Sequence, residues 1–260
     1  MDVGATTLEA LLARDRRATT LVLVAVTVSC WAWLLPMAAD MNGTMDGAAA
    51  WMMIPTWDAR FFSLMLLMWV VMMAGMMLPS ATPAILLYGT IARKRGAARS
   101  PLPAVYAFAS GYLLAWGAFS LAATLAQWGL DRAALMSPMM IATSPVLGAL
   151  ILVAAGAWQW TPLKQACLVS CRSPLHFLAS RWQDGPRGAL RMGVAHGVHC
   201  IGCCWALMLL LFFGGVMSPA WIAAIAGFVL LEKVAPLGAE TGRLAGAVLV
   251  GAGAWMLLVR

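Results

Sequence analysis

The chain has 260 residues, of which 63% are hydrophobic and only 10% are charged. Soluble domains carry roughly 25% charged residues, so this composition excludes an ordinary water-soluble domain. The net charge of +7 does not indicate nucleic-acid binding, because the basic residues form short clusters between apolar runs and no basic groove with interleaved aromatic residues is present.

Long apolar runs predict transmembrane helices. A helix needs about 20 apolar residues to cross a bilayer, and only helices or closed barrels satisfy the backbone in hydrocarbon. The alternating segments of a barrel are absent. We therefore expect an all-α, polytopic transmembrane helical bundle of about seven helices, with spans at roughly 18–37, 61–91, 103–127, 144–162, 192–216, 219–235 and 243–259. Pro79 and Pro83 should kink or break the second span.

The basic residues predict the orientation. With a cytoplasmic N-terminus, all but three of the 17 basic residues lie inside, in agreement with the positive-inside rule for a multi-pass protein of the bacterial inner (plasma) membrane. Residues 1–17 would form a cytoplasmic segment, and 18–260 a single transmembrane domain with an outer Met-rich loop (38–60) and a cytoplasmic loop (163–191). The first span resembles a signal peptide, but its apolar run, Thr19 to Met37, is longer than a typical signal core, so we expect it to be retained.

The 19 methionines are concentrated in the first third of the chain. Met41 and Met45 lie in the polar outer loop, where no apolar core needs filling. Thioethers select copper(I), and they keep this ability in an oxidising compartment where thiols would pair. In the second span four methionines share an arc of about 80°, a pattern that packing alone also explains. These four are Met65, Met68, Met72 and Met76.

All three histidines and five of the six cysteines lie between positions 167 and 204, on the expected cytoplasmic side. In the fifth span four of them share about 100° of one helix face, with Cys204 at its edge. These four are His196, His199, Cys200 and Cys203. The two cysteines that precede this span share a face if the fourth helix continues past Pro162. Two such faces brought together could supply the ligands of a closed metal site. The predicted ligands are Cys167, Cys171, His196, His199, Cys200, Cys203 and Cys204.

Other interpretations of these residues remain open. Cysteine often packs as a small buried hydrophobe, His199 could simply hydrogen-bond a neighbouring carbonyl, and a redox dithiol is a further option. The spacing matches no standard zinc framework, so it identifies no metal by itself. We read Cys30 as a packing residue and His176 as a solvated one.

The sequence shows no Ser/His/Asp grouping, phosphate-binding loop or carboxylate pair, and we expect a protein that is not an enzyme. Glu232 and Lys233 close the sixth span, where we expect them to pair with each other at the cytoplasmic helix end. The spacings Gly193-xxx-Gly197 and Gly242-xxx-Gly246 favour close helix packing.

Three segments resemble a family of bacterial integral membrane proteins of unknown function that are predicted to bind metal. The segments are Trp69–Ser80, Gln159–Arg172 and Gly193–Trp205, and the resemblance covers roughly residues 60–258. It implies a membrane-embedded metal-binding protein and leaves the first span and the outer Met-rich loop unmatched.

These observations predict a membrane protein that handles copper(I), by transport, delivery or storage, with zinc as the alternative metal. Its expected partners are the lipid bilayer, the metal ion and a metallochaperone or a subunit of a membrane complex, with no nucleic acid. One alternative is a membrane thiol oxidoreductase that uses its cysteine pairs with a quinone, and another is a non-catalytic accessory subunit.

Overall fold

The computed structural model of the chain describes residues 3–41, 57–95, 100–137 and 140–259. Within these ranges it contains helices and no β-strand, which confirms the all-α fold class. The helices are α1 (Val3–Met41), α2 (Ala59–Lys94), α3 (Leu102–Arg132), α4 (Pro145–Trp158), α5 (Pro162–Arg172), α6 (Pro174–Arg181), α7 (Gly185–Gly214), α8 (Pro219–Val234) and α9 (Gly238–Leu258).

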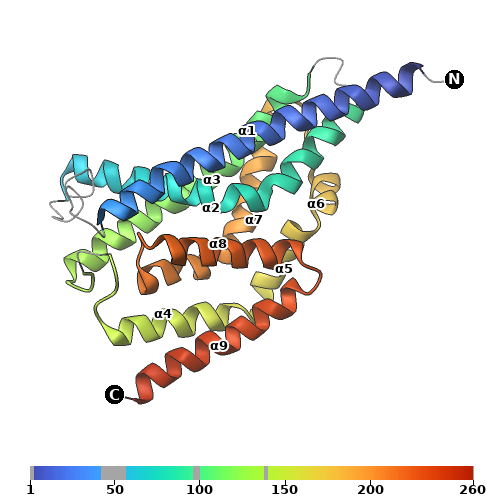
Figure 1. Cartoon of the computed structure of the whole chain (residues 1–260). Helices are drawn as coiled ribbons and strands as arrows, with labels where there is room; N and C mark the ends of the chain where they lie inside the picture. The colour runs from blue at the N-terminus through green and yellow to red at the C-terminus, as the bar shows by residue number, and fades with distance from the viewer. Residues whose placement is uncertain (1–2, 42–56, 96–99, 138–139, 260) are drawn as a thin grey trace.

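The helices form a bundle with two packed groups (Figure 1). In one group α2 packs against α1 and α3, and α3 makes its most extensive contact with α7. In the other group α4 and α9 run side by side, on the far side of the bundle from α1. Helix α8 contacts α2, α7 and α9, and therefore joins the two groups. The short helices α5 and α6 connect α4 to α7 at one end of the bundle.

Five of the described helices are long and apolar enough to cross a membrane: α1, α2, α3, α7 and α9. Helices α4 and α5 would form a sixth crossing if taken together, but they are bent by 64° at their junction. The predicted span 219–235 forms α8, whose 16 residues fall short of the usual length of about 20. The architecture is compatible with a multi-pass membrane protein. Helix α1 begins at Val3, so residues 3–17 of the predicted N-terminal segment are helical and continuous with the first span.

The outermost helices expose apolar side chains that water would disfavour. Leu21 on α1 is 69% exposed, and Val248 and Leu258 on α9 are 71% and 81% exposed. Each such side chain left in water forgoes about 1.5–3 kcal/mol of burial energy. Contact with lipid removes this cost, so these surfaces agree with a membrane environment.

Of the predicted kink or break at Pro79 and Pro83, the break is not present, because α2 is helical from Ala59 to Lys94. A proline leaves unpaired the carbonyl four residues earlier, which for Pro79 is that of Gly75. The Trp31 indole of α1 donates to this oxygen at 3.3 Å. A neighbouring helix thus supplies the missing donor, as membrane helices commonly require.

Glycines allow the backbones of α3 and α7 to come into direct contact. A Cβ atom on Gly193 would lie 2.0 Å from the carbonyl oxygen of Phe108, and one on Gly111 would lie 2.2 Å from that of Leu190. In the α4–α9 pair a Cβ on Gly246 would lie 2.9 Å from the carbonyl oxygen of Gly156. The close packing predicted from the glycine spacings is confirmed.

We predict that Gly193→Ala destabilises the protein by at least about 1–3 kcal/mol, because the new methyl group meets backbone that cannot move aside without separating α3 from α7. The measurement is thermal unfolding in detergent. Gly117→Ala on α3 is the matched control, because no atom lies within 4 Å of its added Cβ. Equal unfolding temperatures for the two variants would contradict the prediction.

Candidate metal centre

The segment with Cys167 and Cys171 forms a helix of its own. Helix α5 begins at Pro162, and the Thr161 side chain caps it by accepting a hydrogen bond from the backbone N–H of Lys164 at 3.2 Å. The fourth helix does not continue past Pro162, which was the condition for Cys167 and Cys171 to share a face with it; the chain instead turns by 64° before α5. The two cysteines still lie one turn apart, on a helix packed against α7.

Four cysteine thiols come together between α5 and α7. The thiols of Cys203 and Cys204 donate to the carbonyl oxygen of Cys200, at 3.0 and 2.9 Å. From α5, the Cys171 thiol interacts with the thiols of Cys200 and Cys203. The three α7 cysteines are at most 2% exposed. We call Cys171, Cys200, Cys203 and Cys204 the thiol cluster.

Polar groups from two further helices contact the Cys200 sulfur. The Lys233 ammonium of α8 donates to Sγ at 2.9 Å, and the Tyr112 hydroxyl of α3 lies 3.1 Å from it. Lys233 also donates to the Ser80 hydroxyl at 3.0 Å, and Tyr112 to the Met77 carbonyl at 3.2 Å. Cys200 therefore lies where α2, α3, α7 and α8 meet.

Glu232 and Lys233 do not pair with each other, contrary to the expectation from sequence. The Glu232 carboxylate lies 2.6 Å from the Lys164 ammonium of α5, which also donates to the Gln159 side chain. Consecutive helix residues point about 100° apart, so the two charges of α8 reach different neighbours. Both members of the Lys164–Glu232 pair are at most 2% exposed. Sequence reasoning missed the contact between Lys233 and Cys200, although a charge inside an apolar span was a signal for it.

The two histidines of α7 have different surroundings. His196 is 3% exposed and lies one turn before Cys200, and its Nδ1 atom has no hydrogen-bond partner. Its ring centroid is 5.8 Å from that of Tyr112 and 5.2 Å from that of Phe177. His199 is partly exposed, and its Nδ1 lies 2.7 Å from the Ala195 carbonyl oxygen of its own helix. His199 therefore makes the carbonyl contact considered as an alternative to metal binding.

Cys167 borders the thiol cluster. A Cβ atom on Gly202 would lie 2.6 Å from the Cys167 sulfur, so this thiol rests on the α7 backbone beside Cys203. It is partly exposed, whereas the α7 cysteines are buried.

The cluster is not arranged as a closed site for one metal ion. Among the described residues, no group of three or more His, Cys, Asp or Glu side chains is placed to hold one ion. The hydrogen bonds explain this, because Cys203 and Cys204 turn toward the backbone of their own helix and an ammonium faces the Cys200 sulfur. A metal ion would need these thiols to turn toward a common point.

The methionine face of the second span is buried inside the bundle. At one end the Met65 sulfur accepts a hydrogen bond from the Gln127 amide at 3.6 Å, and at the other end Met77 and Ser80 contact the partners of Cys200. Its four methionines are at most 2% exposed. With a rise of about 1.5 Å per residue the face is roughly 16 Å long. We call Met65, Met68, Met72 and Met76 the methionine stripe.

Met41 is the last residue of α1, and Met45 lies outside the described residues.

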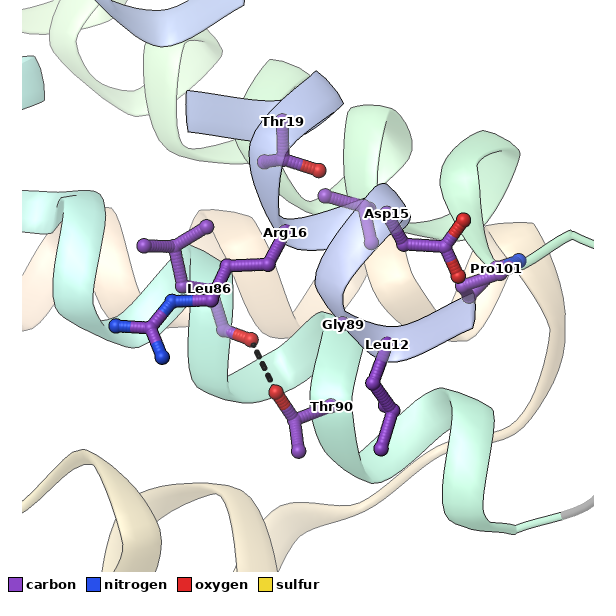
Figure 2. Close-up of a pocket in the computed structure, with 9 residues that line it drawn as sticks. Leu12, Asp15, Arg16, Thr19, Leu86, Gly89, Thr90 and Pro101 are labelled. Carbon is purple, nitrogen blue, oxygen red and sulfur yellow. Dashed lines mark hydrogen bonds between the residues drawn. The ribbon is translucent and has the colours of Figure 1, made fainter. Parts of the chain in front are cut away.

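A surface pocket lies away from these residues, between α1, α2 and the start of α3 (Figure 2). Asp15, Arg16 and Thr90 line it, and Asp15 accepts a hydrogen bond from Arg93 at 2.8 Å. It contains no Cys, His or Met side chain, so it adds nothing to the candidate metal centre.

Residues 66–256 match the family described as PpoB2, copper chaperone. The chain belongs to this family. The match includes the whole thiol cluster and all of the methionine stripe except Met65. It supports a copper-related function, and it agrees with the resemblance to a family predicted to bind metal. No curated protein and no solved structure matches the chain.

We predict that Glu232→Gln destabilises the protein by about 3–5 kcal/mol, because it leaves the Lys164 ammonium buried without a carboxylate. Loss of the pair should also loosen α5 and speed alkylation of Cys171. The double variant Lys164→Met/Glu232→Leu removes both charges and should recover most of the stability. Thermal unfolding and thiol alkylation rates measure the two effects. A single variant no less stable than the double variant would contradict the role of the ion pair.

Proposed function

We propose that the chain is a multi-pass protein of the bacterial inner membrane that binds copper(I) at the thiol cluster and receives it along the methionine stripe. The observation that carries the proposal is the convergence of four thiols, from α5 and α7, at the inner end of a buried row of thioethers. Membership of a copper chaperone family supports copper as the cargo.

The donor set fits a soft monovalent ion. Thiolate and thioether sulfurs favour copper(I) over hard cations. Cys200 and Cys171 come from different helices and already interact, so they are the natural first pair of ligands. Cys203 and Cys204 lie on the same side of α7, within one turn of Cys200, and are available as further ligands. His196 lies one turn from Cys200, and its unpartnered Nδ1 atom makes it an additional candidate.

The order of ligands along the bundle supports inward movement. Thioethers bind copper(I) without losing a proton and leave its charge uncompensated. Thiols lose a proton when they bind the ion, and the resulting thiolates compensate its charge. The ion should therefore be held more tightly at the thiol cluster than on the stripe. Met41 and Met45 of the outer loop would capture the ion first. The positive-inside rule places the loops beside the thiol cluster on the cytoplasmic face. The cluster would then store the ion or deliver it to a cytoplasmic metallochaperone.

We predict that Cys200→Ser/Cys203→Ser lowers the copper(I) content of detergent-purified, reduced protein to near background, because it removes the central thiols of the cluster. The measurement is elemental analysis after loading and desalting. Cys30→Ser is the matched control, since Cys30 packs against Gly75 between α1 and α2 and should leave the copper content unchanged. Unchanged copper in the double variant would defeat the proposed site. A thiol count that changes with redox state, without bound copper, would favour the oxidoreductase alternative.

We predict that Met68→Leu/Met72→Leu slows copper(I) loading of the thiol cluster several-fold but leaves its final copper content unchanged. Leucine conserves the volume and removes the thioether, so the fold is kept. Loading is measured in proteoliposomes supplied with copper(I) from the outer side. Met256→Leu on α9, which packs toward α4, is the control. If both variants load at the wild-type rate, the stripe has no part in the path.

A further inference from the structure

Lys233 is a buried cation without a carboxylate partner in the part of the chain that the structure describes. Its side chain is 8% exposed, and its ammonium donates to the Cys200 sulfur and the Ser80 hydroxyl. The carboxylate of the adjacent Glu232 forms an ion pair with Lys164 instead. The ion pairs among the described residues are Lys164–Glu232 and Arg93–Asp15, and neither includes Lys233.

A buried ammonium is stable only if a nearby negative charge compensates its own charge. Removing an ion from water costs several kcal/mol unless an opposite charge compensates it. The nearest group that can become negative is the Cys200 thiol, 2.9 Å from the ammonium. The positive charge of Lys233 therefore lies against the thiol cluster before any metal ion binds.

We propose that Lys233 makes the thiol cluster selective for a monovalent metal ion over divalent ions; this inference rests on the proposed copper(I) function. When Cys200 and Cys171 lose their protons and bind a monovalent ion, one negative charge is left over, and Lys233 neutralises it. The same pair of thiolates with a divalent ion is already neutral, and Lys233 then remains as an unbalanced buried charge. The low dielectric of the bundle interior makes this difference large.

The coordination geometry also favours a monovalent soft ion over zinc(II). Structural zinc sites use four ligands in a tetrahedron. In the described part of the chain no three suitable side chains surround one point, and the ammonium occupies the side of Cys200 that faces α8. An ion that binds only a few soft ligands needs less rearrangement of the thiol cluster than a four-coordinate zinc ion does.

The primary test removes the charge of Lys233 and keeps its length. Wild type, Lys233→Met and Lys233→Arg are each titrated with copper(I) against a chromophoric copper(I) chelator, and with zinc(II) against a zinc chelator. Lys233→Met should lower the ratio of copper(I) to zinc(II) affinity by at least about tenfold, and Lys233→Arg should keep it within about threefold of wild type. A wild-type ratio in Lys233→Met would overturn the inference.

A second pair of variants tests the charge without altering Lys233. Ser80→Asp places a carboxylate beside the ammonium, and Ser80→Asn is its uncharged match. The Asp variant should lower the affinity ratio as Lys233→Met does, and the Asn variant should not. If Lys233→Met does not fold, equal ratios for Ser80→Asp and Ser80→Asn overturn the inference. Wild-type protein that binds no copper(I) refutes the proposed function itself, whereas wild-type binding with unaltered ratios in the variants refutes only the role of Lys233.

Discussion

The direct contact between the backbones of α3 and α7 sets the positions of the other functional groups. Gly111 and Gly193 leave no room for a side chain between these helices, so the rotation of α7 is fixed relative to α3. With this rotation the Cys200 sulfur lies against the Tyr112 hydroxyl, and His196 lies within an aromatic environment. Any larger residue at the glycines would turn or displace the helix that carries most of the thiols. Close helix packing and the candidate metal centre are therefore one structural feature.

Helix α8 connects the remaining elements through two consecutive charges. Glu232 holds α5 through Lys164, and α5 brings Cys171 to α7. Lys233 contacts Cys200 and Ser80, and so joins α7 to the middle of α2. Buried charges are costly and demand partners with well-defined geometry. The helix too short to be a typical span is thus the one that places α5, α7 and α2 around the thiol cluster.

The thioether and thiol side chains occupy successive parts of the bundle. The methionine stripe is buried along α2 and ends where Met77 and Ser80 contact the partners of Cys200. In the proposed function, thioethers that bind a soft ion without compensating its charge would therefore lead to thiols that can compensate it once deprotonated. The copper chaperone family to which the chain belongs agrees with a soft ion as cargo. In the proposed scheme, Lys233 would make the thiol cluster at the end of this path prefer a monovalent ion.

The sequence by itself determined the all-α class, the positions of the long apolar helices and the two groups of sulfur residues. These properties are local: hydrophobic run length, glycine spacing and residue type are visible without coordinates. The tertiary structure decided which of the candidates meet. It placed Cys171 with the α7 thiols, turned His199 to its own backbone, broke the helix before Pro162 and directed Glu232 and Lys233 to different partners. The direction of a side chain depends on how its helix is rotated against its neighbours, and only the packing of the whole bundle fixes that rotation.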